Sequence, residues 1–419
     1  MCKLSSTYIK VTNNDKVDYV FVFLIVLLLT GSGLFGFFST LMFLIIGACF
    51  VVLNFKYSLA AYAGNWLFFM YGVVGVLSSF WAEFPLAALR SGIQFILTIS
   101  IFLAIFYCVK INVILTAISA AMLVVMVFNV FSSQTVEIAF TGEIVKVGYF
   151  GSKNNMSMVA GFALLSGCSV FLCGKVYFFS RLLAVACIVL SMMTFLQARS
   201  LGSTVSLFLV VAFSMLLFLY SRTSISNITK LNINIIASFS LVLIICFSVV
   251  MFDYSVYENF MYSLGKDPTI TGRTNIWAIG FESIKEHPIL GVGQSSYWNL
   301  ENVGALEIWE MTHREEGSPF GFHNLYIHNY VELGVFGLLA IVLVFIKLFF
   351  AINVLVLKRM RSIDIIFISF FLMIFLKSFF ESVGFSAFSL TSFFLCLSWV
   401  HIRRASFYDK PASIKLRLN

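Results

Sequence analysis

Charged residues are scarce in this sequence. Only 11% of its 419 residues are Asp, Glu, Lys or Arg, whereas a typical soluble domain carries roughly a quarter. Proline is also rare, with five residues, so no proline-rich linker divides the chain. Hydrophobic residues make up 60% of the chain and the mean hydropathy is +0.99. This composition excludes a soluble globular protein and indicates an integral membrane protein.

The sequence also lacks a cysteine framework and a metal-binding pattern. Its eight cysteines lie within apolar segments, apart from Cys2 at the terminus, so neither structural disulfides nor a zinc site is expected. His323 and His328 are five residues apart and would fall on different faces of a helix, and no H-E-x-x-H motif is present. We therefore expect neither a metal nor another cofactor.

The apolar runs predict an all-α membrane protein. A spanning helix needs about 20 mostly apolar residues, and about twelve such segments are present. They cover roughly residues 17–31, 34–54, 58–79, 92–109, 112–131, 155–173, 177–197, 203–220, 234–252, 329–349, 364–380 and 385–400. The first lacks a clear A-x-A cleavage site, so it reads as an uncleaved span. We predict a single polytopic domain, residues 1–419.

The distribution of charge predicts the orientation. Most of the 27 basic residues fall on one side of the predicted spans, and most of the 19 acidic residues fall on the other. Because positive charge accumulates on the cytoplasmic side, both termini are expected in the cytoplasm. The net charge of +8 thus reports topology and lipid contact, and no nucleic-acid partner is expected. The longest polar connection, residues 253–325 between the ninth and tenth spans, would be a periplasmic loop with short helices.

A helix is predicted within this loop over residues 274–288. Trp277 and Ile284 follow helical spacing, and Thr274 is placed as the N-cap. A helix N-terminus presents free N–H groups and positive partial charge. Arg273 beside it would therefore form a site for phosphate or pyrophosphate.

Further polar residues fall on the same predicted face. Arg199 ends the seventh span, and Lys153 and Asn154 open the sixth. Each of these basic residues has an alternative interpretation as an interfacial side chain whose charge reaches water. Lys377 and Glu381 are four residues apart and are expected to pair with each other.

Two His-Asn pairs precede the tenth span. His323 suits a general base because its ordinary pKa near 6.5 permits proton transfer at neutral pH. The alternative for such a histidine is helix capping or contact with lipid headgroups. Asn324, His328 and Glu332 are taken as candidates for substrate binding.

The order of these motifs resembles the O-antigen polymerase and ligase family, membrane glycosyltransferases that act on polyprenyl-diphosphate-linked glycans. The succession is LSSFWAEFPLAAL, GYFGSKNN, QARSLGST, TGRTNIWAIGFESIKEHPILGVG and HNLYIHNYVELGVFGLL. The resemblance runs from about residue 75 to residue 385. It is strongest in the G-R-T-x-I-W and H-N-x-Y segments and in the E-x-G that follows.

The resemblance implies a twelve-span helical bundle with a large periplasmic loop between spans nine and ten. It also implies that Arg199 and Arg273 hold the donor diphosphate and that His323 is the base or orients the acceptor. His328 is extra relative to the family pattern, which leaves open which histidine faces the active cavity. The expected substrate-binding residues are Asn324, Lys153, Asn154, Thr274, His328 and Glu332.

The predicted function is polymerisation of lipid-linked repeat units at the periplasmic face of the bacterial inner membrane. The alternatives are a ligase that transfers the glycan to lipid A core, a protein O-oligosaccharyltransferase, and a flippase or transporter. Transporters usually place ionisable groups near the membrane midplane, whereas the polar residues here gather at one face. Expected partners are the polyprenyl-diphosphate-linked oligosaccharide, membrane lipids, a chain-length regulator and a flippase.

Overall fold

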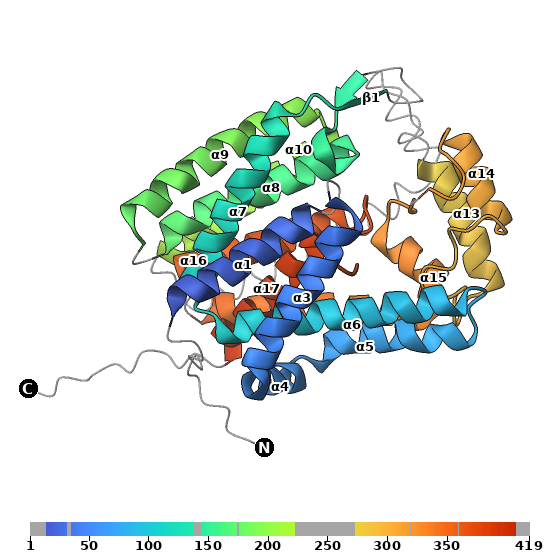
Figure 1. The fold of residues 1–419 in the computed structure, drawn as a ribbon, viewed down its shortest axis with the longest axis horizontal. Coiled ribbons are helices and arrows are strands. Elements are labelled where there is room, and N and C mark those ends of the chain that lie inside the picture. Colours follow the sequence, from blue (N-terminus) through green and yellow to red (C-terminus); the bar gives the residue numbers. More distant parts are fainter. Residues whose placement is uncertain are drawn as a thin grey trace, which may run out of the picture.

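The computed structural model describes residues 14–31, 35–137, 144–173, 176–222, 273–318, 320–358 and 360–407. Within these ranges the protein is mostly helical (Figure 1), as predicted. A short antiparallel hairpin joins β1 (Thr135–Glu137) to β2 (Ile144–Lys146). The predicted ninth span and the first part of the predicted large loop, residues 253–272, lie outside the described residues.

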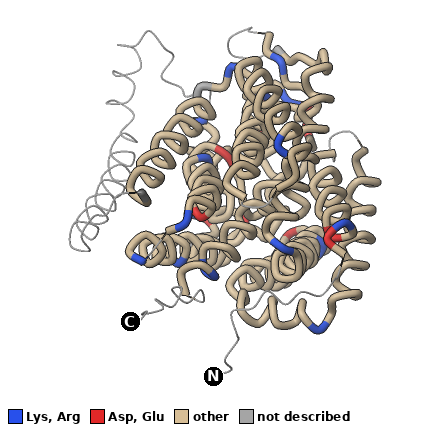
Figure 2. Tube along the Cα trace, turned by 90° about the vertical axis from the view of Figure 1, so that its left-hand side faces the viewer, with Lys and Arg blue, Asp and Glu red and all other residues tan. Residues whose placement is uncertain are grey.

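Most helices form one bundle. Charged residues are sparse in these helices (Figure 2). The bundle contains α1 (Asp15–Thr30), α3 (Phe37–Leu53), α4 (Phe55–Gly64), α5 (Trp66–Leu77), α6 (Pro85–Cys108), α7 (Ile111–Phe131), α8 (Lys153–Leu172), α9 (Phe178–Ala198), α10 (Leu201–Arg222), α15 (Leu325–Leu357), α16 (Ser362–Lys377) and α17 (Leu390–Phe407). Two 3₁₀ turns, η1 (Ser78–Phe80) and η2 (Gly148–Phe150), connect them.

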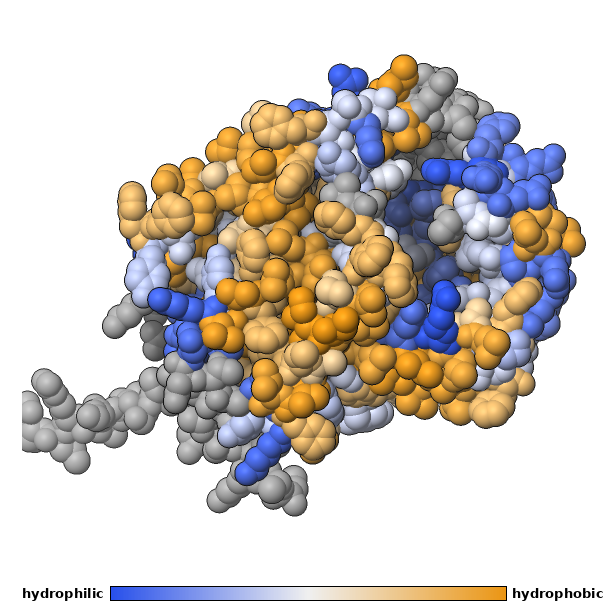
Figure 3. Space-filling model, in the orientation of Figure 1, coloured by the Kyte–Doolittle hydropathy of each residue, from blue (hydrophilic) through white to orange (hydrophobic). Residues whose placement is uncertain are grey.

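The bundle is that of a multi-pass membrane protein. Among the described helices, six are long and apolar enough to span a membrane, namely α6, α7, α8, α9, α10 and α15, and the bent pair α3 and α4 would make a seventh. A broad hydrophobic face covers much of the bundle (Figure 3), as expected for helices that contact lipid. The total of twelve spans stays a prediction.

The predicted third span, residues 58–79, is wrong as one continuous helix. The chain bends by 100° between α3 and α4, and it breaks again at Asn65 between α4 and α5. Asn65 Nδ2 donates to the carbonyl of Ala61 and its Oδ1 accepts a hydrogen bond from Trp399 Nε1 at 2.7 Å. Average hydropathy over a window of residues cannot predict this break, because it depends on the single side chain of Asn65 and its contact with the distant Trp399.

Phenylalanine rings fill the centre of the bundle around α17, which is buried along most of its length. The ring of Phe394 stacks on that of Phe162 with centroids 4.5 Å apart and contacts Phe370 at the same distance. Phe393 makes edge-to-face contacts with Phe102 and Phe106. These contacts hold α6, α8, α16 and α17 together, so the loops at their ends are fixed relative to one another.

A smaller layer covers one end of the bundle, and we call residues 273–323 the loop layer. It contains α13 (Arg273–Glu286) and α14 (Val303–Met311) and has its own core, which includes Trp277, Tyr297 and Trp309. In Figure 1 the loop layer lies beside the start of α15. A hydrophilic hollow opens between it and the hydrophobic face (Figure 3).

The loop layer is attached at a break in α15. Gly334 has φ +60° and ψ −155°, which interrupts the helix. The carbonyls of Val331 and Glu332 accept hydrogen bonds from Val292 N and Gly293 N at 2.9 and 2.8 Å. Backbone groups freed inside an apolar helix need such partners. The E-x-G motif is therefore where the loop layer docks on α15.

We predict that Gly334→Ala destabilises the protein. A Cβ at this position would lie 2.1 Å from the carbonyl oxygen of Ile289, and φ +60° disfavours any side chain. The expected loss is on the order of 3 kcal/mol, measured as a lower melting temperature of the detergent-purified protein. Gly202→Ala is the matched control, since no atom lies within 4 Å of its added Cβ. Equal melting temperatures for both variants would contradict this role of Gly334.

Candidate functional site

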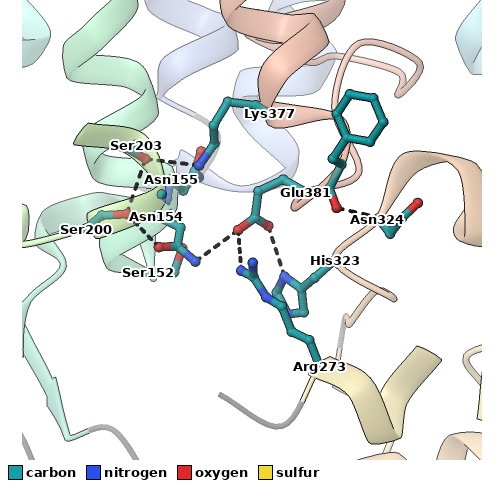
Figure 4. Close-up of polar contacts among 12 residues, drawn as sticks. Ser152, Asn154, Asn155, Ser200, Ser203, Arg273, His323, Asn324, Lys377 and Glu381 are labelled. Atoms are coloured by element: carbon teal, nitrogen blue, oxygen red, sulfur yellow. Dashed lines mark hydrogen bonds and ion pairs between the residues drawn. The ribbon is translucent and has the colours of Figure 1, made fainter. Parts of the chain in front are cut away.

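A single carboxylate, that of Glu381, joins its own loop to three distant segments of the chain. Its Oε1 accepts hydrogen bonds from Arg273 Nη2 at 2.8 Å and from Asn154 Nδ2 at 2.9 Å. Its Oε2 lies 2.9 Å from His323 Nδ1 (Figure 4). Three of the residues predicted to form the site thus meet at one acidic side chain. We call Asn154, Arg273, His323 and Glu381 the Glu381 cluster.

Serine hydroxyls extend the Glu381 cluster towards Lys377. Asn154 Oδ1 accepts a hydrogen bond from Ser200 Oγ at 2.9 Å. Ser203 Oγ accepts hydrogen bonds from Ser157 Oγ at 2.7 Å and from Lys377 Nζ at 3.0 Å. These contacts join the starts of α8 and α10 to the end of α16.

The predicted pairing of Lys377 with Glu381 is therefore wrong. Lys377 is the last residue of α16, and its side chain extends between α8 and α10, whereas that of Glu381 extends towards the loop layer (Figure 4). Lys377 instead contacts Ser203, and Glu381 contacts Arg273 and His323. Spacing of four residues brings two side chains together only while the helix continues.

The segment before α15 holds His323 in position. His323 has φ +49°, a left-handed conformation that is uncommon for a residue with a side chain. Asn324 caps α15, because its Oδ1 accepts hydrogen bonds from Tyr326 N and Ile327 N. Its Nδ2 donates to the carbonyl of Phe379 at 3.2 Å. The residue that caps the helix is thus Asn324, whereas helix capping had been one interpretation of His323. Asn324 also holds the neighbouring His323 close to the loop that carries Glu381.

Arg273 is placed by the start of α13. Its ion pair with Glu381 is largely buried, with side-chain exposures of 12% and 17%. Thr274 is the second helical residue, so its prediction as the N-cap is wrong; the helix begins before it. Its Oγ1 is buried without a hydrogen-bond partner. Trp277 Nε1 donates to the carbonyl of Phe322 at 2.7 Å, which joins α13 to the residue before His323.

The electrostatics keep Glu381 ionised and leave an excess of positive charge. Burial raises the pKa of Glu381, but the hydrogen bond and charge of His323, together with Arg273 and Lys377, outweigh this and lower the pKa to about 2. One carboxylate therefore contacts one arginine and one histidine and has Lys377 nearby. Such a site attracts anions.

Comparison with known proteins shows two similarities. A family described as O-antigen ligase matches residues 186–342 of this chain. The Exopolysaccharide production protein ExoQ of Rhizobium meliloti (strain 1021) is 26% identical over 340 residues, which cover 80% of this chain and 74% of ExoQ. The chain is therefore similar to the O-antigen ligase family in this segment and to an exopolysaccharide production protein over most of its length. Its long apolar helices are those of a multi-pass membrane protein.

The segment matched by the family includes Arg199. Arg199 directly precedes a residue that binds the Glu381 cluster. Arg199 ends α9 with φ +46° and is exposed, and the next residue is Ser200, which binds Asn154. Lys153 is half-buried at the first position of α8, directly before Asn154. Their predicted contacts with substrate stay predictions.

The two candidate histidines have different partners. His323 lies against Glu381, whereas His328 is on α15 with its Nε2 3.8 Å from Glu332 Oε2. Glu332 is only 4% exposed, and its carbonyl binds the loop layer. The structure thus assigns His323 to the Glu381 cluster and gives Glu332 a structural contact. Whether His328 and Glu332 also bind substrate stays a prediction.

Glu381 is the residue that sequence reasoning misplaced. It lies beyond residue 342, where the family match ends. A signal was nevertheless present, because two cationic candidates and a histidine were predicted to meet without an acidic partner. A buried arginine is rarely left without one.

Glu381→Gln tests this electrostatic arrangement through pH. Because its folded-state pKa is lowered, Glu381 contributes stability that is present above its unfolded pKa of about 4.3 and is lost as the pH falls towards 2. The contribution is at most about 3 kcal/mol. We expect the melting temperature of the native protein to fall more steeply between about pH 5 and pH 3 than that of the variant.

Glu282→Gln is the matched control, because Glu282 forms an exposed pair with Lys285. Its pH dependence should equal that of the native protein. A Glu381→Gln variant with the native slope would contradict the assigned role of the carboxylate.

Proposed function

We propose that this protein is a glycosyltransferase that polymerises polyprenyl-diphosphate-linked repeat units at the periplasmic face of the bacterial inner membrane. The observation that carries the proposal is the Glu381 cluster, in which a histidine and an arginine meet at the end of a membrane bundle. The family and its exopolysaccharide-producing relative support the same activity. Both termini are proposed to lie in the cytoplasm, opposite the loop layer.

The transfer needs a leaving group and a base. A hydroxyl oxygen of the acceptor sugar attacks the anomeric carbon of the donor, and the bond from that carbon to the diphosphate oxygen breaks. The hydroxyl proton passes to His323, and the polyprenyl diphosphate departs with the negative charge. Arg273 and Arg199 stabilise that charge, so the reaction requires positioning and electrostatics without an external energy source.

Glu381 acts as a positioning residue. When Nδ1 of His323 carries a proton and donates it to Oε2, the other ring nitrogen, Nε2, is free of a proton and can accept one from the acceptor. The guanidinium of Arg273 has five N–H donors, of which the contact with Oε1 uses one. Its remaining donors suit phosphate oxygens.

Polymerisation is preferred to ligation because the relative is named for exopolysaccharide production, whereas a ligase would end at lipid A core. Ligation is the second candidate, since the matching family is described as O-antigen ligase. Either reaction takes a polyprenyl-linked glycan as its donor. A flippase that supplies the repeat units and a chain-length regulator are the proposed protein partners.

Substitution of the proposed catalytic residues tests the site. His323→Ala, Arg273→Ala and Arg199→Ala are each expected to leave the protein in the membrane while lowering long-chain glycan by about 100-fold or more. Gel electrophoresis of the polysaccharide measures this. His287→Ala is the control, because His287 is an exposed histidine in the same loop layer. Native chain length in all three variants would refute the assignment.

Deletion of the protein separates the two candidate reactions. For a polymerase, we expect glycans that carry a single repeat unit, since transfer to an acceptor continues without elongation. For a ligase, long lipid-linked polymer would accumulate and the core would carry no glycan. The same gel, with a lipid extraction beside it, distinguishes these patterns.

A further inference from the structure

A cavity of about 340 Å³ lies between the end of α1, the turn η2, the start of α8 and the loop of residues 382–391. Its polar lining consists of hydroxyl and amide side chains: Thr30, Tyr149, Asn155, Ser382, Ser389 and Thr391. No Asp, Glu, Lys, Arg or His is among the described residues that line it. A lining of this kind suits a neutral, hydroxyl-rich ligand and does not suit a diphosphate.

The cavity adjoins the Glu381 cluster. Asn155 follows Asn154 in α8, and Ser382 follows Glu381, so two segments supply both the cluster and the cavity wall. Figure 4 shows Asn154 and Asn155 side by side at the start of α8. A ligand in this cavity would therefore lie next to the groups that position His323 and Arg273.

The wall keeps hydrogen-bonding capacity for a ligand. Ser382 Oγ is buried and has no hydrogen-bond partner. A buried hydroxyl without a partner costs about 1–3 kcal/mol, and a ligand hydroxyl would recover this. By contrast, Ser389 and Thr391 bond to each other at 2.7 Å, and Thr391 Oγ1 also accepts from Gly384 N. These two residues fix the shape of the wall beside Ser382.

Apolar side chains complete the cavity. Phe150, Met158 and Phe388 line it, and such groups pack against the C–H faces of sugar rings. Phe388 has φ +52°, and its N–H donates to Thr98 Oγ1 at 3.3 Å. A residue held in this conformation is a feature that recurs at ligand sites. The loop thus presents Phe388 to the cavity at a conformational cost.

We propose that this cavity binds one neutral sugar ring of the lipid-linked glycan, while the Glu381 cluster binds the diphosphate. This inference rests on the proposed glycosyltransferase function. The volume is at the small end of ligand pockets, which run from about 300 to 1,000 Å³, and therefore suits one ring better than a whole repeat unit. The cavity would then select which sugar reaches His323.

Ala387→Phe tests the cavity, because Ala387 lines it and the larger side chain would fill it. Ser386→Phe is the matched control, since Ser386 is exposed in the same loop and does not line the cavity. Binding to the detergent-purified full chain would be measured by thermophoresis with three probes. These are the oligosaccharide released by mild acid from the cells' own polymer, the lipid-linked repeat unit, and a polyprenyl diphosphate without sugar.

We expect Ala387→Phe to weaken binding of a sugar-bearing probe about 10-fold or more and to leave the sugar-free polyprenyl diphosphate unaffected. Weakened binding of the free oligosaccharide identifies the acceptor sugar as the occupant. An effect on the lipid-linked repeat unit alone identifies the donor sugar. Ser382→Ala, which removes one hydroxyl and should fold normally, is expected to weaken the same probe about 5- to 10-fold.

Two results would overturn the inference. Weaker binding of the sugar-free polyprenyl diphosphate to Ala387→Phe would make the cavity a lipid site. Native affinity of both cavity variants for every sugar-bearing probe would show that no sugar enters it. Failure of the proposed function looks different, because the native protein itself would then bind no probe and its deletion would leave the polymer unchanged.

Discussion

The contacts of the largely buried Glu381 carboxylate are the interaction on which the proposed site depends. Without this carboxylate, the guanidinium of Arg273 would be buried without an ionic partner, and His323 would lose the group that fixes its ring. Each of its partners comes from a different segment: α8, α13 and the turn before α15. One anion therefore sets the geometry between the membrane bundle and the loop layer.

The backbone supports this arrangement from two directions. Asn324 caps α15 and binds the carbonyl of Phe379, so His323 and Glu381 are held at adjacent helix ends. Further along α15, backbone groups at the break around Gly334 form hydrogen bonds with residues 289–293. These bonds attach the loop layer to α15 at a second point. The H-N and E-x-G motifs thus serve one purpose, because both attach the loop layer to α15.

Hydropathy and charge were sufficient to predict the helical class and the approximate position of most described helices, because burial in lipid demands long apolar runs. They could not predict the breaks at Asn65 and Gly334, where a side-chain amide or a distant loop replaces helical hydrogen bonds. For the site, the predicted topology placed Arg273, His323 and Asn154 on one face. Glu381 was misassigned to Lys377, since the end of α16 separates two residues that spacing alone would pair.

The most direct test is a transfer assay with purified protein in lipid nanodiscs and purified lipid-linked repeat units, without nucleotide. We expect oligomers of two or more repeat units to form, together with one polyprenyl diphosphate released per bond. Glu381→Gln is expected to slow this transfer and to change its pH profile, because His323 loses its ionic partner. Absence of transfer by the native protein would contradict the proposed activity, and an unchanged rate and pH profile in Glu381→Gln would contradict the role of this carboxylate.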